Sequence, residues 1–342
     1  MYACDVTVAS LVHNKTPYRD IIIGHSSSGQ LLGATCVSPY LRADGTVAAE
    51  IDVSVEHGSR RKGIASHLIA RALDVCRREG VTTAEMHIGK RNHPTRKIAL
   101  SFKAHESNEG VFEIQLPIRS DNSVRLTHLK TAENNLLFSS DHEPQCLLIH
   151  GAGGGAWQWQ SHLMRALAQR GIGSVAVQTD FMSHRNVSCA HPDNLTTPAM
   201  IDATEKFPIR AIVGHSLGCI AATNLATIVD PRLLTLCNPM PANGLSPVEA
   251  RHSAESLRCH RAAGSLLALH RYESTKRWPG RLLVIHGTTD KVSPHNYAKR
   301  TIDHHRRASS ALKIFDAGHL SIKSPLVTNH IADQTRVVFD CT

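Results

Sequence analysis

The chain has 342 residues, of which 42% are hydrophobic and only 4% aromatic, so aliphatic side chains must fill its cores. Its formal net charge is +9, but the basic residues are dispersed without an aromatic stacking platform, which argues against a nucleic-acid-binding function. No stretch reaches the roughly 18 apolar residues that a membrane helix needs.

The numbers and spacing of the cysteines and histidines narrow the class of protein further. The nine cysteines contain no CxxC pair, which argues against a disulfide framework and predicts a reducing, cytoplasmic compartment. The 23 histidines show no HExxH spacing, so no metal site is expected. The N-terminus lacks a basic region followed by an apolar one, and we interpret it as mature sequence.

The first part of the chain predicts an α+β domain over residues 1–119. The predicted elements are a hairpin of residues 21–23 and 31–37, a strand over 46–55, a helix over 66–79 and a strand over 83–88. The helix has one apolar face, and Gly80 follows it as a terminating glycine.

A polar segment, residues 120–143, predicts a linker that can include the first hairpin of a second domain. The second domain, residues 144–342, predicts repeated strand–loop–helix units. Its short apolar strands are predicted over 146–149, 174–178, 209–213, 233–236, 282–285 and 312–315. This pattern indicates an α/β fold with a doubly wound, mostly parallel sheet.

Gly214–Gly218 has the pattern G-x-S-x-G between an apolar strand and a predicted helix. A tight turn from strand to helix exposes a serine hydroxyl at the sheet edge, and small flanking residues are needed to fit it. The context therefore predicts Ser216 as a nucleophile.

A serine nucleophile needs a base, and the base needs an orienting acid. Downstream, a strand ends at a loop with Asp290, and the next strand is followed by His319. We predict that His319 accepts the Ser216 proton and that Asp290 orients His319. The competing acids are Asp316, which precedes the histidine loop, and Asp303, on a helix that we expect to be basic and exposed together with His304 and His305. Position 238, after the predicted strand 233–236, is a further candidate place for the acid, but it holds an uncharged asparagine.

The oxyanion requires backbone N–H donors. The glycine-rich segment His150–Trp157 follows the first strand of the second domain and matches neither GxGxxG nor GxxxxGK[ST]. We predict Ala152, assisted by Gly153, as one donor and Leu217 as the other.

The motifs HGAGGGAWQW, GHSLG, GTTDKVSP and AGH, in this order, resemble the α/β-hydrolase superfamily over about residues 145–338. The HGAGxGAW form is similar to the branch of methylesterases and hydroxynitrile lyases. The resemblance implies ester, thioester or amide hydrolysis without a cofactor, and a short cap around residues 241–279. The arginines of that cap allow two interpretations, a lid for an acidic substrate or a solvated helix face.

In the first domain, Arg60–Ala65 reads RRKGIA between a predicted strand and helix, and it resembles motif A of the GNAT acetyltransferases. The resemblance implies binding of acetyl-CoA or another acyl-CoA. The predicted CoA-binding residues are Val53, Val55, Arg60, Arg61, Lys62, Gly63, Ile64 and Ala65. Too few residues precede Ile21 for the family's first two helices, and Ser101-Phe102 stands where its tyrosine is expected.

These patterns predict a serine hydrolase that cleaves a small-molecule ester or thioester through an acyl-enzyme, fused to a GNAT-like domain. The alternative is a CoA-dependent N-acyltransferase with an accessory hydrolase domain, in which activity survives loss of Ser216. A third alternative is a non-enzymatic interaction protein. The sequence does not specify the acyl group, the leaving group or the oligomeric state.

Overall fold

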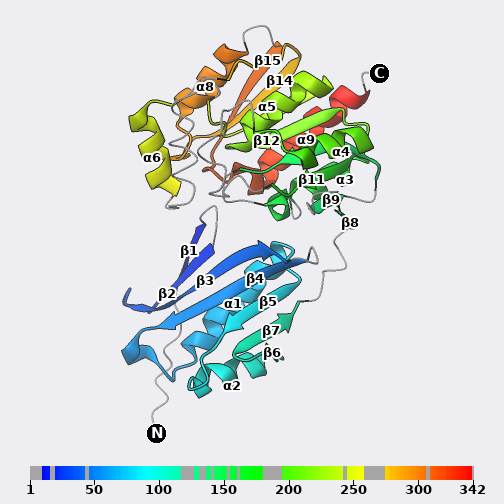
Figure 1. The fold of residues 1–342 in the computed structure, drawn as a ribbon. Coiled ribbons are helices and arrows are strands. Elements are labelled where there is room, and N and C mark those ends of the chain that lie inside the picture. Colours follow the sequence, from blue (N-terminus) through cyan, green and yellow to red (C-terminus); the bar gives the residue numbers. More distant parts are fainter. Residues whose placement is uncertain are drawn as a thin grey trace. The chain divides into compact units, whose positions relative to one another are not determined.

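The computed structural model divides into two compact units, residues 1–121 and 122–342, which are described separately (Figure 1). It describes residues 10–15, 20–42, 46–116, 127–130, 136–139, 142–151, 155–159, 162–179, 195–241, 245–257, 274–305 and 309–340. None of the helices in these ranges combines the length and the apolar character required of a membrane span.

The N-terminal unit is a seven-stranded sheet in the order β1-β2-β3-β4-β5-β7-β6. Its strands are β1 (Ser10–Lys15), β2 (Asp20–His25), β3 (Leu31–Leu41), β4 (Val47–Val55), β5 (Thr83–His87), β6 (His105–Asn108) and β7 (Val111–Gln115). Its helices are the single 3-10 turn η1 (His57–Ser59), α1 (Ile64–Arg78) and α2 (His93–Ser101). The predicted hairpin, strands and helix are all present in the predicted chain order.

Helix α1 packs on β3 and β4 because one of its faces is apolar. Leu68, Ile69, Ala72, Leu73 and Cys76, which recur at helical spacing, are all buried. The core beneath the helix also contains Ile22, Leu32 and Val75. Strand β1 ends at Lys15 and β2 begins at Asp20, so the sequence between them is too short for a pair of helices.

Strands β4 and β5 are parallel and are joined through α1, but they pair over a short length. The paired residues are Ala48–Glu50 on β4 and Thr83–Glu85 on β5. Strand β4 then continues to Val55 without further pairing to β5, although it stays paired with β3 up to its end. The β5-facing edge of Ile51–Val55 is therefore free of strand hydrogen bonds within the described residues.

The C-terminal unit is an eight-stranded sheet in the order β15-β14-β13-β12-β10-β11-β9-β8 (Figure 1). Its strands are β8 (Thr127–Lys130), β9 (Leu136–Ser139), β10 (Pro144–Ile149), β11 (Gly173–Val177), β12 (Ala211–His215), β13 (Leu233–Cys237), β14 (Arg281–Gly287) and β15 (Ser309–Phe315). Strands β10 to β15 run parallel, whereas β9 pairs antiparallel with both β11 and β8. The predicted doubly wound, mostly parallel sheet is confirmed.

Helices cover both faces of this sheet. The described helices of this unit are α3 (Leu163–Ala168), α4 (Pro198–Lys206), α5 (Gly218–Val229), α6 (Pro247–Leu257), α8 (His295–His304) and α9 (Pro325–Asp340), with 3-10 turns η2 (Ala156–Trp159) and η5 (Ser321–Lys323). Helices α4, α5 and α8 share one core with alternate strand residues. Helices α3 and α9 pack together, and Arg170, which follows α3, donates to Asp333 of α9 at 2.6 Å. Every residue of β11, β12 and β13 is buried, as expected for strands covered on both sides.

Strands β8 and β9 lie within the segment predicted as the linker, residues 120–143. They form the hairpin for which that prediction left room, and β9 attaches it to the main sheet through β11. The first strands of the C-terminal sheet therefore come from a polar segment without a strong strand signal.

Candidate active site

Ser216 stands at the turn between β12 and α5, with φ of +54°, a conformation that is rare for a residue with a Cβ atom. Its N–H donates to the Cys237 carbonyl at 2.9 Å, which ties the turn to the end of β13. A Cβ atom on Gly218 would lie 2.3 Å from the His150 carbonyl oxygen, and one on Gly214 would lie 2.8 Å from the Cα of Cys219. The glycines of the motif are therefore required by close backbone packing around the strained serine.

His319 follows β15 and brings its ring to Ser216. Its Nε2 lies 3.0 Å from Ser216 Oγ, and its Nδ1 lies 2.9 Å from Asp290 Oδ2. Because Nδ1 faces a carboxylate, it carries the proton, which leaves Nε2 as the acceptor for the serine hydroxyl. The structure thus brings together the three residues that the sequence predicted as nucleophile, base and acid.

Asp290 lies in the loop after β14, and both of its oxygens are occupied. Oδ2 meets His319, while Oδ1 accepts the N–H groups of Val292 at 2.8 Å and Ser293 at 2.9 Å. Burial raises the pKa of Asp290, but the charge and hydrogen bond of His319 and the two N–H donors outweigh it, so the net pKa is lowered. Asp290 is therefore a carboxylate at neutral pH.

The competing acids lie elsewhere. Asp316 is exposed and accepts a 3.3 Å hydrogen bond from Thr288 Oγ1. Asp303 is exposed on α8, as expected, but the expectation that His304 and His305 are exposed is wrong. His304 Nε2 contacts the Lys276 carbonyl at 2.8 Å, and His305 Nδ1 accepts the Trp278 N–H at 3.2 Å. Both histidines turn inward because the chain before β14 offers them hydrogen-bond partners.

Asn238, set aside in the sequence because it is uncharged, lies at the centre of this site. It follows β13, is fully buried and has φ of +46°. Its side chain contacts the histidine loop and the end of β14. The sequence did not predict these contacts of Asn238, because they join segments that are distant along the chain.

The predicted oxyanion donors are only partly within the described residues. Ala152 and Gly153 lie outside them. Leu217 directly precedes α5, and no described acceptor contacts its N–H. A Cβ atom on Gly151 would lie 2.8 Å from Ser216 Cβ, so the chain after β10 passes directly against the nucleophile. Glycine at 151 permits this close approach.

Helix α6 lies within the predicted cap, residues 241–279. Its start has a capping box, in which Ser246 N–H donates to Glu249 at 2.7 Å and Glu249 N–H donates to Ser246 Oγ at 3.2 Å. Glu249 also bonds Arg300 on α8 at 2.8 Å. Residues 258–273 of the cap lie outside the described residues.

In the N-terminal unit, the predicted phosphate-binding segment Arg60–Ala65 links η1 to α1. Arg61 and Gly63 have positive φ, +62° and +78°, and alternation of left-handed residues turns successive N–H groups to one side. No described acceptor contacts the N–H groups of Arg61, Lys62 or Gly63, and no side chain caps α1. Arg60, Arg61 and Lys62 are exposed, so their charges surround these free donors.

The other predicted CoA-binding residues differ in exposure. Ile64 is buried in the core under α1, whereas Ala65 is half-buried. Val53 and Val55 are half-buried on β4 and pack against that core. Arg60 Nε donates to the Val55 carbonyl at 3.3 Å, which joins the segment to the end of β4.

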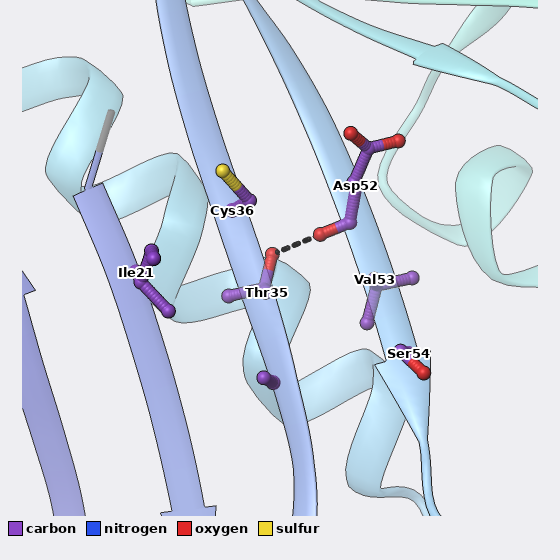
Figure 2. Close-up of a pocket in the computed structure, with 7 residues that line it drawn as sticks. Ile21, Thr35, Cys36, Asp52, Val53 and Ser54 are labelled. Atoms are coloured by element: carbon purple, nitrogen blue, oxygen red, sulfur yellow. Dashed lines mark hydrogen bonds between the residues drawn. The ribbon is translucent and has the colours of Figure 1, made fainter. Parts of the chain in front are cut away.

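A shallow pocket of about 280 Å³ lies beside the same part of β4. Its lining residues are Ile21, Ala34, Thr35, Cys36, Asp52, Val53 and Ser54. Figure 2 shows these residues on three neighbouring strands, with Thr35 Oγ1 donating to the Asp52 carbonyl at 2.8 Å. Ile21, Cys36 and Asp52 are register partners across the strands, so their side chains share one face of the sheet.

Metal ligation finds no support within the described parts of the chain, where no three His, Cys, Asp or Glu side chains form a suitable group. Asn92, which directly precedes α2, caps this helix by accepting the Thr95 N–H at 3.3 Å.

Comparisons with known proteins give two family matches. A model of the α/β-hydrolase family matches residues 146–258, and a model of the GNAT acetyltransferase family matches residues 8–102. No curated protein matches the chain.

Similar solved structures have low sequence identity. Rv0554 from Mycobacterium tuberculosis is 16% identical, with a TM-score of 0.46, over 61% of this chain and 97% of that one. A thermophilic esterase is 15% identical, with a TM-score of 0.45, over 63% and 98%. The thioesterase domain from the curacin biosynthetic pathway is 16% identical, with a TM-score of 0.42, over 64% and 100%. By its family matches, the chain joins a region similar to the GNAT acetyltransferase family, residues 8–102, to a region similar to the α/β-hydrolase family, residues 146–258.

Proposed function

We propose that the C-terminal domain is a serine hydrolase that cleaves a small-molecule ester or thioester through an acyl-enzyme on Ser216. The observation that carries this proposal is the chain of contacts from Ser216 Oγ to His319 Nε2 at 3.0 Å and from His319 Nδ1 to Asp290 Oδ2 at 2.9 Å. Three residues far apart in the sequence meet at the carboxyl ends of parallel strands, where α/β folds place their chemistry.

In the first half of the reaction, His319 Nε2 accepts the hydroxyl proton while Ser216 Oγ attacks the acyl carbon. The oxyanion receives the Leu217 N–H and, as proposed, the N–H groups of Ala152 and Gly153. His319 then gives its proton to the departing alkoxide or thiolate, which leaves as an alcohol or thiol. Asp290 stabilises the imidazolium that exists between these two proton transfers.

In the second half, a water molecule occupies the place of the leaving group. His319 takes one of its protons, and the resulting hydroxide attacks the acyl-enzyme carbonyl. The Ser216 oxygen leaves as the tetrahedral intermediate collapses and recovers its proton from His319. The products are the free acid and the original enzyme, and no cofactor enters the balance.

The test is covalent labelling with a fluorophosphonate probe, which reacts with activated serines. We expect the wild-type chain to be labelled and Ser216→Ala to remain unlabelled, while Ser293→Ala, which changes a buried serine in the loop after Asp290, stays labelled. A folded wild-type protein that takes up no label contradicts the proposal. Unlabelled wild-type protein is then assayed against panels of carboxylic esters and acyl-CoA thioesters to separate the two substrate classes.

A second function, CoA-dependent N-acyl transfer, is favoured by one observation. The segment Arg60–Ala65 offers N–H groups without acceptors, open space around Gly63 and three exposed cations, and this chemistry fits a pyrophosphate. When bound there, acetyl-CoA or another acyl-CoA would supply an activated acyl group. The free edge of Ile51–Val55 can pair with the amide groups of its pantetheine arm.

Calorimetric titration with CoA tests this function. Lys62→Glu should weaken binding about tenfold or more, and the effect should shrink at high salt because it is electrostatic. Lys97→Glu makes the same charge change on the exposed surface of α2 and should leave affinity nearly unchanged. Equal effects of the two variants would show that CoA responds only to net charge. Acyl transfer to an amine that survives Ser216→Ala would favour this alternative over hydrolysis.

A further inference from the structure

The side chain of Asn238 makes an unusual set of hydrogen bonds for a residue outside the proposed triad. Its Nδ2 donates to the His319 carbonyl at 2.6 Å, and it also lies 3.1 Å from the Gly318 carbonyl and 3.0 Å from Ser321 Oγ. Its Oδ1 accepts the Gly287 N–H at 2.9 Å. One amide therefore connects the loop that carries His319 to the end of β14, three residues before Asp290.

The backbone of Asn238 is fixed as firmly as its side chain. The Asn238 N–H donates to the Ile285 carbonyl at 2.8 Å, which anchors it on β14. Its positive φ is a conformation that asparagine tolerates better than most residues. Gly287 accommodates the histidine loop, because a Cβ atom there would lie 2.2 Å from the Ala317 carbonyl oxygen. The strand ends and the loop are thus packed with the amide between them.

A second side chain holds the same carbonyl of His319. His215 Nε2 lies 2.8 Å from that oxygen, and His215 directly precedes Ser216. Burial, together with neighbouring His319, lowers the pKa of His215 to about 3, so it is neutral at ordinary pH and donates through Nε2–H. Two side-chain donors, His215 before Ser216 and Asn238 after β13, therefore converge on the His319 carbonyl oxygen.

This arrangement requires an amide at position 238. A carboxylate of the same shape has only acceptors, so it could still receive the Gly287 N–H but would face the His319 and Gly318 carbonyls without hydrogens to donate. An unpaired acceptor buried beside two other acceptors is unfavourable. An acid at this place would therefore disturb the main chain of His319.

We propose that Asn238 is a positioning residue, which holds the main chain of His319 so that its ring spans Ser216 and Asp290. The proposal rests on the proposed function of these three residues. Asn238 touches neither the reacting atoms nor the imidazole ring through any described hydrogen bond. It affects the reaction by fixing the backbone position from which the His319 imidazole extends. A misplacement of that ring by about 1 Å can cost on the order of 10²-fold in rate.

Two variants separate the amide from the backbone. Asn238→Gly keeps the left-handed conformation without strain and removes the side chain with its amide. Asn238→Asp keeps the shape and removes the donors. Thr335→Val, which loses a buried 2.8 Å hydrogen bond to the Ile331 carbonyl on α9, controls for a general loss of stability.

The kinetic readout is kcat and KM for an ester that the wild type hydrolyses, with rates normalised to titrated active serines. We expect kcat to fall about 10²-fold in both Asn238 variants with KM nearly constant, and both constants to stay near wild type in Thr335→Val. Unchanged kcat per titrated site in Asn238→Gly or Asn238→Asp would overturn the proposal.

A readout independent of turnover separates this proposal from the proposed function. The proton between His319 Nδ1 and Asp290 should give a downfield NMR signal, assigned by its loss in Asp290→Asn. We expect this signal to shift or broaden in both Asn238 variants and to persist in Thr335→Val. A persistent, unshifted signal in the Asn238 variants contradicts positioning. A wild type that shows the signal but takes no fluorophosphonate label contradicts the hydrolase function alone.

Discussion

At the scale of single residues, Asp290 and Asp316 are two acids that precede the same histidine, and they can be told apart by exchange for asparagine. Asp290→Asn keeps the shape but removes the charge that stabilises an imidazolium, so we expect kcat to fall about 10³-fold or more. Asp316→Asn should leave kcat near wild type, because Asp316 is exposed and bonded to Thr288. Ester hydrolysis at saturating substrate measures both. A larger loss of kcat in Asp316→Asn than in Asp290→Asn would contradict this assignment and identify Asp316 as the acid.

The sequence contained enough information to predict Ser216, Asp290 and His319 as a set, because each follows an apolar strand and the order of motifs restricts the choice. It was not sufficient for Asn238. No local pattern shows that an uncharged residue after β13 reaches two carbonyls eighty positions away. Roles of this kind depend on how loops meet at the edge of a sheet, and such contacts leave no periodic signal.

At the scale of elements, His305 at the C-terminal end of α8 makes the free energy of unfolding depend on pH. His305 accepts the Trp278 N–H through Nδ1, and burial, with the nearby charges of His304 and Arg277, lowers its pKa to about 4 from the ordinary 6.5. Between these values the unfolded chain binds a proton that the folded chain does not. The stability that His305 contributes is therefore present above pH 6.5 and lost as pH falls toward about 4.

The variant His305→Asn offers an amide oxygen to the same N–H and cannot titrate. We expect its free energy of unfolding to change less steeply with pH across this window than that of the wild type. Urea unfolding at a series of pH values, followed by circular dichroism, measures both slopes. Equal slopes would mean that other groups govern the acid response.

Elements with strong apolar signals were predictable, and weak ones were not. The apolar runs of β10 to β15 predicted all six of these strands. Strands β10 to β14 are mostly buried, whereas β15 lies at the edge of the sheet and is mostly exposed. Strand β6 is different, because all four of its residues are exposed and only its pairing with β7 makes it a strand. Pairing between segments distant in space overrides local preference at sheet edges.

At the scale of the whole molecule, the two units have separate cores, and buried cysteines report on each. Cys76 lies on the buried face of α1, whereas Cys219 and Cys237 are buried at the serine turn, where burial raises the pKa of both thiols. We expect these thiols to resist alkylation in the native protein. In rising denaturant, Cys76 should become reactive at a midpoint different from that shared by Cys219 and Cys237, as mass spectrometry of the peptides would show. One common midpoint would indicate that the units unfold together.

The short pairing of β4 with β5 divides the N-terminal sheet into two halves. Strands β1 to β4 form one half and β5, β7 and β6 the other. Within the described residues the ladder between the two halves is limited to Ala48–Glu50 and Thr83–Glu85, next to one further hydrogen bond from the Thr82 N–H to the Val47 carbonyl. The two halves are thus joined by a short seam, and α1 packs against β2, β3 and β4 of the first half. A ligand bound along the unpaired edge of Ile51–Val55 would stiffen the domain without contacting its core.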